Sequence, residues 1–206
     1  MGYALDRLMN DLRVRLPGAL DDAIKLELFS VVDEFCKETN AWQEKIILPV
    51  HSGETSYEIE PEDNRAIIVR LLYVVTYNPD DSSSATLPVA AALPQPDLII
   101  FALPPSDVSE YAVTVALAPI DPVNVSDGLP QFPDWFLILY SQELIDGVLA
   151  RMMSQPAKPY FSREGFRYHG RRFRAAMSRV RGAVIQQNAY GAQTWRFPAF
   201  APCNSR

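Results

Sequence analysis

The sequence has few of the side chains on which most catalytic and metal sites depend. Its 206 residues include only two histidines, His51 and His169, and two cysteines, Cys36 and Cys203. It contains no zinc-ligand spacing, CxxC pair, phosphate-binding loop, GxGxxG turn or nucleophile elbow. Two cysteines near opposite ends of the chain give no basis for a structural disulfide, so we expect reduced thiols, with Cys36 buried on a helix. These absences predict a protein without catalytic residues, metal or cofactor.

One enzymatic alternative concerns a turn that contains the first histidine. A histidine beside acidic residues can act as a general base, and His51 lies near Glu54 and Glu58 in the sequence. A surface turn offers no pocket for a substrate, so we expect the protein not to be an enzyme.

Long apolar runs are also missing. A helix that spans a bilayer needs about 20 consecutive apolar residues, and the best candidates, 66–75 and 97–103, are interrupted by Arg70 or ended by Pro104. Residues 1–7 lack the basic flank and apolar stretch of a signal peptide. We therefore expect neither a membrane protein nor a secreted one. A chain of this length buries about 70% of its surface on folding, which is enough for a self-supporting core.

Acidic residues are nearly absent from the carboxy-terminal quarter. Residues 151–206 hold eleven Lys and Arg but one acid, Glu164, giving +10, whereas residues 1–150 hold eight Lys and Arg against 24 Asp and Glu, giving −16. Either the basic end covers the acidic body of its own chain, or it binds a neighbouring copy or a different protein. Nucleic-acid binding is a third alternative, although the basic stretch has no helix-turn-helix or finger pattern and the whole chain is acidic.

The first clear helical pattern follows Pro17. Asp21 and Asp22 suit the positive end of a helix dipole, and apolar residues then recur at spacings of three and four. We expect an amphipathic helix that ends near Trp42, with Trp42 covering the core below it. Its expected apolar positions are Leu20, Ile24, Leu28, Val31, Phe35 and Thr39.

Helical periodicity returns near the carboxy-terminal end. We expect Asp134 to cap one helix, 135–153, and Ser162 to cap a last one, 163–189. The first of these carries the apolar residues Trp135, Leu139, Leu144, Ile145, Val148, Leu149 and Met152.

The region between favours short strands, because its apolar and β-branched segments are separated by turns containing Gly, Pro, Asn and Ser. Strands at this spacing are typical of a small antiparallel sandwich or barrel. The expected segments are 46–50, 57–60, 66–77, 87–93, 98–103 and 111–117.

The order of these elements predicts the fold class. No helix buries its apolar face alone, so the N-terminal helix and the two C-terminal helices must pack together. We expect an α+β fold, with a helical bundle base, an inserted small antiparallel β-sandwich or barrel, and an extended C-terminal tail. The corresponding ranges are 1–43 with 130–190 for the helical domain, 44–129 for the insertion and 191–206 for the tail.

The last helix should carry an apolar seam beside a row of arginines. Like charges at helical spacing repel by a few tenths of a kcal/mol per pair, so we expect acidic partners across a subunit contact, although a solvated surface is the simpler alternative. We expect close backbone approach at Gly170 in the seam. The seam comprises Phe166, Gly170, Phe173, Met177, Val180 and Val184. The row, here called the arginine face, comprises Arg163, Arg167, Arg171, Arg174 and Arg181.

The tail is rich in aromatic residues and proline, which favours an extended peptide. Trp195, Arg196, Phe197 and Phe200 are its candidate anchors, because aromatic and Arg side chains commonly anchor interfaces. The tail either folds back on its own domain or docks on a partner, and we expect docking.

Several segments, in this order and spacing, resemble the head-to-tail adaptor proteins of tailed bacteriophages and gene transfer agents, including the tail tubular protein A type. The amino-terminal helix ending in Asn-Ala-Trp and the hairpin at 52–59 share the resemblance, whereas 78–125 does not. The carrying segments are 132–136, 144–153, 155–160, 168–173, 188–191 and 195–198.

The resemblance implies a structural virion protein at the head-tail junction, assembled in the host cytoplasm. It implies a homo-oligomeric ring, typically of twelve copies, that binds the portal protein and a tail or nozzle protein without any membrane. Double-stranded DNA would pass through its lumen without sequence-specific binding, and an acidic body suits such a lumen. In this family the carboxy-terminal segment commonly reaches into the portal, so the resemblance implies that Trp195, Phe197 and Phe200 are anchors. The alternative is a DNA-binding module that uses the basic helix.

Overall fold

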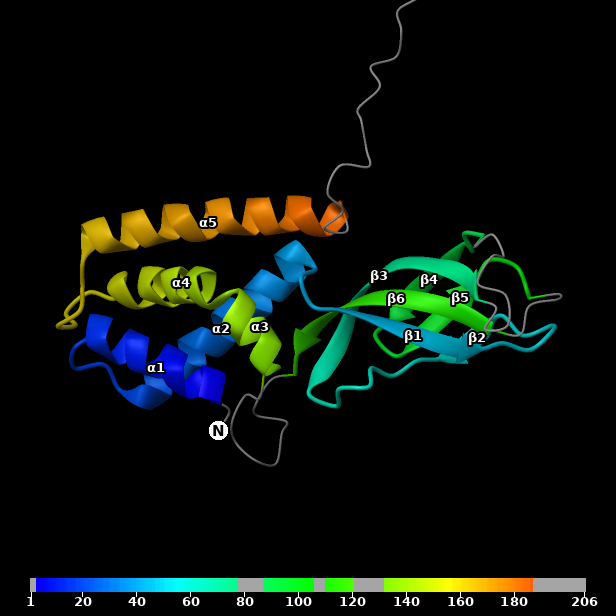
Figure 1. Ribbon diagram of the computed structural model, residues 1–206, viewed down its shortest axis with the longest axis horizontal. Helices are drawn as coiled ribbons and strands as arrows, with labels where there is room; N and C mark the ends of the chain where they lie inside the picture. The colour runs from blue at the N-terminus through cyan, green and yellow to red at the C-terminus, as the bar shows by residue number, and fades with distance from the viewer. Residues whose placement is uncertain (1–2, 78–86, 106–109, 121–131, 187–206) are drawn as a thin grey trace, which may run out of the picture.

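The computed structural model describes residues 3–77, 87–105, 110–120 and 132–186. This part of the chain is a mixed α/β fold with five helices and two small antiparallel sheets. The helices gather at one end of an elongated molecule and the sheets at the other (Figure 1). Neither sheet closes on itself within the described residues, so the expectation of a barrel is wrong.

Each sheet has three strands. In the first sheet the order is β1, β6, β3, and in the second it is β2, β5, β4. The central strand β6 is buried along nearly its whole length because β1 and β3 flank it and α2 contacts it. The strands are β1 (Gln43–Pro49), β2 (Ser56–Glu58), β3 (Ala66–Tyr77), β4 (Ala91–Gln95), β5 (Leu98–Phe101) and β6 (Glu110–Pro119).

The helices agree in part with the expectations. Helix α2 ends at Thr39, close to where the periodicity predicts, and Trp42 is buried as expected, with its ring centroid 6.2 Å from that of Phe136. Leu20, expected to be buried, is 77% exposed because it precedes the first turn of α2. The helices are α1 (Tyr3–Arg15), α2 (Asp21–Thr39), α3 (Asp134–Leu139), α4 (Ser141–Met153) and α5 (Arg163–Ile185).

The single helix expected at 135–153 is two helices, because the backbone leaves helical geometry at Tyr140 (φ −110°, ψ 17°). The Tyr140 ring packs 5.0 Å from that of Phe35, between α3 and α4. Asp134 does not cap α3; it is its first residue, and Pro133 precedes it without a side-chain cap. Trp135 and Leu139, expected in the core, are 48% and 62% exposed because the break turns their side of α3 outward.

Helix α4 packs closely against α2 and α5 at a glycine. A Cβ at Gly147 would lie 2.5 Å from Cγ1 of Val31 and 3.0 Å from Cε2 of Phe173. At Gly170 the nearest atom to such a Cβ is that of Ala150, at 3.8 Å, which is an ordinary contact. The close approach expected at Gly170 is therefore found at Gly147 instead.

The expected burial of Cys36 is confirmed: its side chain is fully enclosed on α2. This burial, with the charge of Asp33 as a smaller contribution, raises the pKa of the Cys36 thiol. Cys203 lies outside the described residues. In the described ranges no helix combines the length and apolar character that crossing a bilayer requires.

Candidate functional site: the arginine face of helix α5

The start of α5 is fixed by a side-chain cap. The hydroxyl oxygen of Ser162 accepts a hydrogen bond from the Gly165 amide at 3.0 Å, which confirms the expected cap. Helix α5 then runs to Ile185, and 187–189, the end of the expected helix, lies outside the described residues.

One side of α5 packs on the rest of the helical end, largely as the seam predicts. Gly170, Phe173 and Val180 are buried, and Met177 and Val184 pack partly buried against the core. Phe166 is an exception, at 42% exposed. Helix α4 ends at Met153, which lies beside Gly165, so Phe166 extends past the surface that α4 covers.

Two arginines of α5 that lie outside the arginine face bind acidic residues of α4. Nε of Arg172 donates to Asp146 Oδ2 at 2.9 Å, and a terminal nitrogen of Arg179 donates to Glu143 Oε1 at 2.6 Å. The same Asp146 carboxylate is 2.7 Å from Nδ1 of His169. These pairs join α4 to α5 and were not foreseen from the sequence. The sequence offers one signal for them. Glu143 and Asp146 are three residues apart on one helix, and the next helix carries the basic residues.

Asp146 is the most deeply buried charged residue of this group, with 3% of its surface exposed. A buried carboxylate is tolerated when hydrogen-bond donors satisfy it, and here both oxygens have a partner. The hydroxyl of Tyr168, 2.9 Å from Arg172, and the charge of Asp146 raise the pKa of the Arg172 guanidinium. This group therefore keeps the two helices in register.

The arginine face lies beside the apolar seam, on the solvent side of α5. All five of its residues, Arg163, Arg167, Arg171, Arg174 and Arg181, are exposed. Within the described part of the chain none of them forms an ion pair. One hydrogen bond is local: Nε of Arg171 donates to the backbone oxygen of Arg167 at 3.3 Å. The arrangement therefore presents guanidinium groups at helical spacing that form no ion pair within the described residues, although Glu164 lies beside Arg163 in the first turn of α5.

A shallow cavity of about 340 Å³ opens in the middle of the arginine face. Gly170 has no side chain to fill it, and Phe166, Arg167, Arg171 and Arg174 surround it. Because guanidinium groups bind carboxylates through paired hydrogen bonds, this cavity suits an acidic side chain with an apolar stem.

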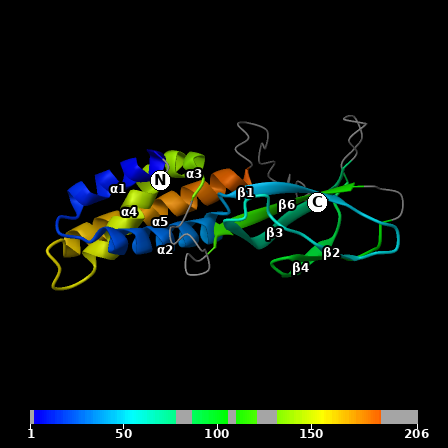
Figure 2. The same ribbon diagram turned by 90° about the horizontal axis from the view of Figure 1, so that it is seen from below.

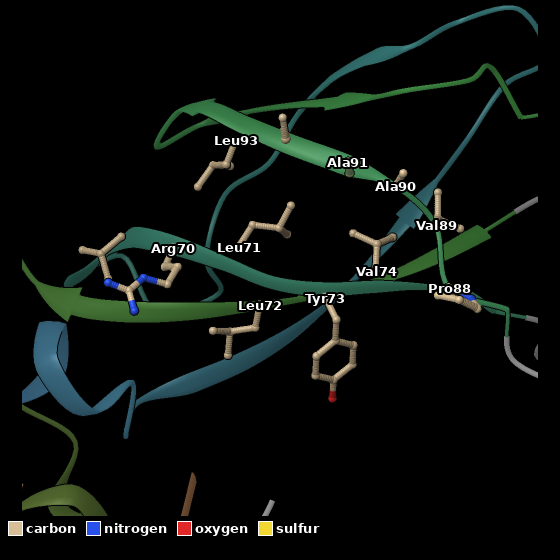
Figure 3. A pocket seen from close by; sticks show the side chains of 12 residues that line it. Arg70, Leu71, Leu72, Tyr73, Val74, Pro88, Val89, Ala90, Ala91 and Leu93 are labelled. Carbon is tan, nitrogen blue, oxygen red and sulfur yellow. The ribbon is translucent and has the colours of Figure 1, made fainter. Parts of the chain in front are cut away.

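A second cavity, of about 560 Å³, lies at the sheet end between β3 and β4 (Figure 3). Leu71 and Val74 of β3 point toward the side of β4 that bears Leu93. The chain just before β4 meets β3 where the Val89 amide donates to the Val74 oxygen at 2.9 Å. Its lining is largely apolar, with Arg70 and Tyr73 as the polar side chains.

The turn proposed for the enzymatic alternative is open to solvent. His51, Glu54 and Glu58 are all exposed. The hydroxyl of Tyr57, rather than the His51 side chain, fixes the turn, accepting from the His51 amide at 2.9 Å. This geometry adds nothing in favour of His51 as a general base.

The remaining candidate site residues are in the tail. Trp195, Arg196, Phe197 and Phe200 lie outside the described residues, so their docking stays a prediction. In comparisons with known proteins, the sequence matches no protein-family model and no curated protein.

Proposed function

We propose that the chain is a structural adaptor of a virion head-tail junction, which joins protein partners through the basic end of its chain. The observation that carries this proposal is the arginine face, which is exposed and has no acidic partner in the described residues. Arginines that serve folding have such partners, as Arg172 and Arg179 do. The charge of the outer arginines is therefore available to another polypeptide.

In this proposal the helices form a bundle-like base and the strands a sandwich-like insertion. Copies form a ring below a portal protein, with a tail or nozzle protein on the other side and double-stranded DNA passing through. The arginine face contacts the portal or a neighbouring copy, and Trp195, Arg196, Phe197 and Phe200 anchor the tail on the portal.

The test is a truncation after Ala189, which removes all four tail anchors. The full chain should bind purified portal rings, and the truncated chain should keep its circular-dichroism spectrum and lose portal binding. Normal portal binding by the truncated chain would contradict the role of the tail. Failure of the full chain to bind any portal would contradict the adaptor function itself.

A DNA-binding module is the second candidate, because the arginine face repeats positive charge at nearly every helical turn. Duplex affinity measured against salt separates the two. A phosphate-binding helix shows a linear loss of log affinity against log salt, with a slope of about −0.9 per phosphate contact. An adaptor should show no more than weak, non-specific duplex binding.

A further inference from the structure

The sheet end carries a row of unpaired acids. Glu58 at the end of β2, and Glu60 and Glu62 after it, are exposed, whereas Ile59 between them is buried. The Ile59 amide donates to the Asp97 oxygen at 2.8 Å, which holds the segment beside the start of β5. Glu58 and Glu60 therefore project from the side opposite Ile59, and Glu62 follows where the chain bends. We call Glu58, Glu60 and Glu62 the acidic segment.

None of these three glutamates forms an ion pair within the described part of the molecule. The acidic segment is therefore the counterpart of the arginine face: a regular row of charge, of the opposite sign, with no partner in its own described chain.

The two rows have similar spacing. Glu58 and Glu60 flank the buried Ile59, and side chains two residues apart in an extended chain are about 6.6 Å apart. Arg163, Arg167 and Arg171 are four residues apart along α5, a rise of about 6 Å per step. Glutamates laid along the helix at this spacing would thus meet successive arginines with small side-chain adjustments.

Within one molecule the rows cannot meet. The first half of α5 lies at the end of the helical region farthest from the sheets, whereas β2 lies at the opposite end of the long axis (Figures 1 and 2). Any pairing between them must therefore join two molecules.

We propose that the acidic segment of one copy lies along the arginine face of a second copy, with a glutamate seated in the cavity above Gly170. The occupant of the arginine face is thus this chain itself. The contact joins different surfaces of the two molecules, so it repeats from copy to copy and generates a ring if the rotation closes. This contact would join neighbouring copies of the proposed adaptor. Its place in a ring rests on the proposed function.

The full chain should self-associate at low ionic strength and dissociate in high salt, since exposed ion pairs are screened. Sedimentation velocity on Arg167→Glu/Arg171→Glu and on Glu58→Arg/Glu60→Arg should show each variant monomeric alone. Like charges then face each other, which should weaken association by more than about tenfold. An equimolar mixture of the two variants should associate again, because each supplies the row that the other has lost.

The matched control is Arg7→Glu/Arg15→Glu, which makes the same change in net charge at exposed positions of α1. This control should associate like the wild type, and all variants should keep wild-type circular dichroism. A monomeric wild type, a mixture that stays monomeric, or a control that dissociates as the α5 variant does would each overturn the inference. So would a monomeric wild type whose arginine face binds duplex DNA instead.

Portal binding by the same proteins separates this inference from the proposed function. Portal binding without self-association overturns the copy-to-copy contact and leaves the adaptor proposal standing. Self-association that follows the charge swap, without portal binding, supports the contact and contradicts the adaptor proposal.

Discussion

The two sides of α5 place the same residue type in different surroundings. Toward α4, Arg172 binds the buried carboxylate of Asp146 at 2.9 Å, and Arg179 binds that of Glu143 at 2.6 Å. Toward solvent, the arginine face forms no ion pair among the described residues. The charge of an arginine adds to stability mainly through the partner that it binds. The inner pairs thus hold α4 and α5 in register, whereas the outer charges contribute little to the fold.

The largest loss of stability is expected when the buried carboxylate of Asp146 is removed. Asp146→Ala leaves the largely buried His169 and the half-exposed Arg172 without their acceptor, which should cost about 2 to 3 kcal/mol of unfolding free energy. Urea denaturation measures it. A loss below about 1 kcal/mol would mean that the inner pairs do not fix the helices.

A second test compares two glycines at the inner side. Gly147→Ala forces Val31 or Phe173 to move and should cost about 2 kcal/mol. Gly170→Ala meets only an ordinary contact and should stabilise the helix by up to about 1 kcal/mol. Thermal unfolding of the two variants measures whether each change lowers or raises stability. Equal effects would contradict the packing described for α4.

A third test addresses the more exposed inner pair. Arg179 is 71% exposed at its side chain, so solvent screens its pairing with Glu143. Arg179→Ala should therefore cost less than about 1 kcal/mol. A cost equal to that of Asp146→Ala, measured in the same urea series, would show that burial is not what separates the two pairs.

The smallest effect on stability is expected on the outer side. Arg167→Ala/Arg171→Ala removes charges with no partner in the described residues and should change the unfolding free energy by no more than about 0.5 kcal/mol. The same variant should lose self-association in sedimentation. Marked destabilisation would mean that these arginines stabilise the fold, as Arg172 and Arg179 do.

Local signals in the sequence located several elements well. The bounds of β3, the cap at Ser162 and the end of α2 follow from β-branched runs, a polar cap residue and apolar spacing. Helix α1 is missing from the expectations, although its buried Leu5, Leu8 and others carry helical spacing. That signal was available in the sequence.

The break at Tyr140 had no comparable signal. Leu137 is buried while Ile138 and Leu139 beside it are exposed, and an unbroken apolar run cannot show which of its members face the core. The position of Tyr140 against Phe35, contributed by a helix a hundred residues earlier in the chain, decides it.

The sequence by itself determined the separation of charge along the chain and the single row of arginines on α5, because both depend only on composition and on the helical repeat. The tertiary structure alone decided which arginines are neutralised and which remain available. That depends on α4 placing Glu143 and Asp146 beside Arg179 and Arg172, and on the acidic segment following β2 in the sheet region, away from the first half of α5. Such distances arise from packing between remote segments, which no local pattern encodes.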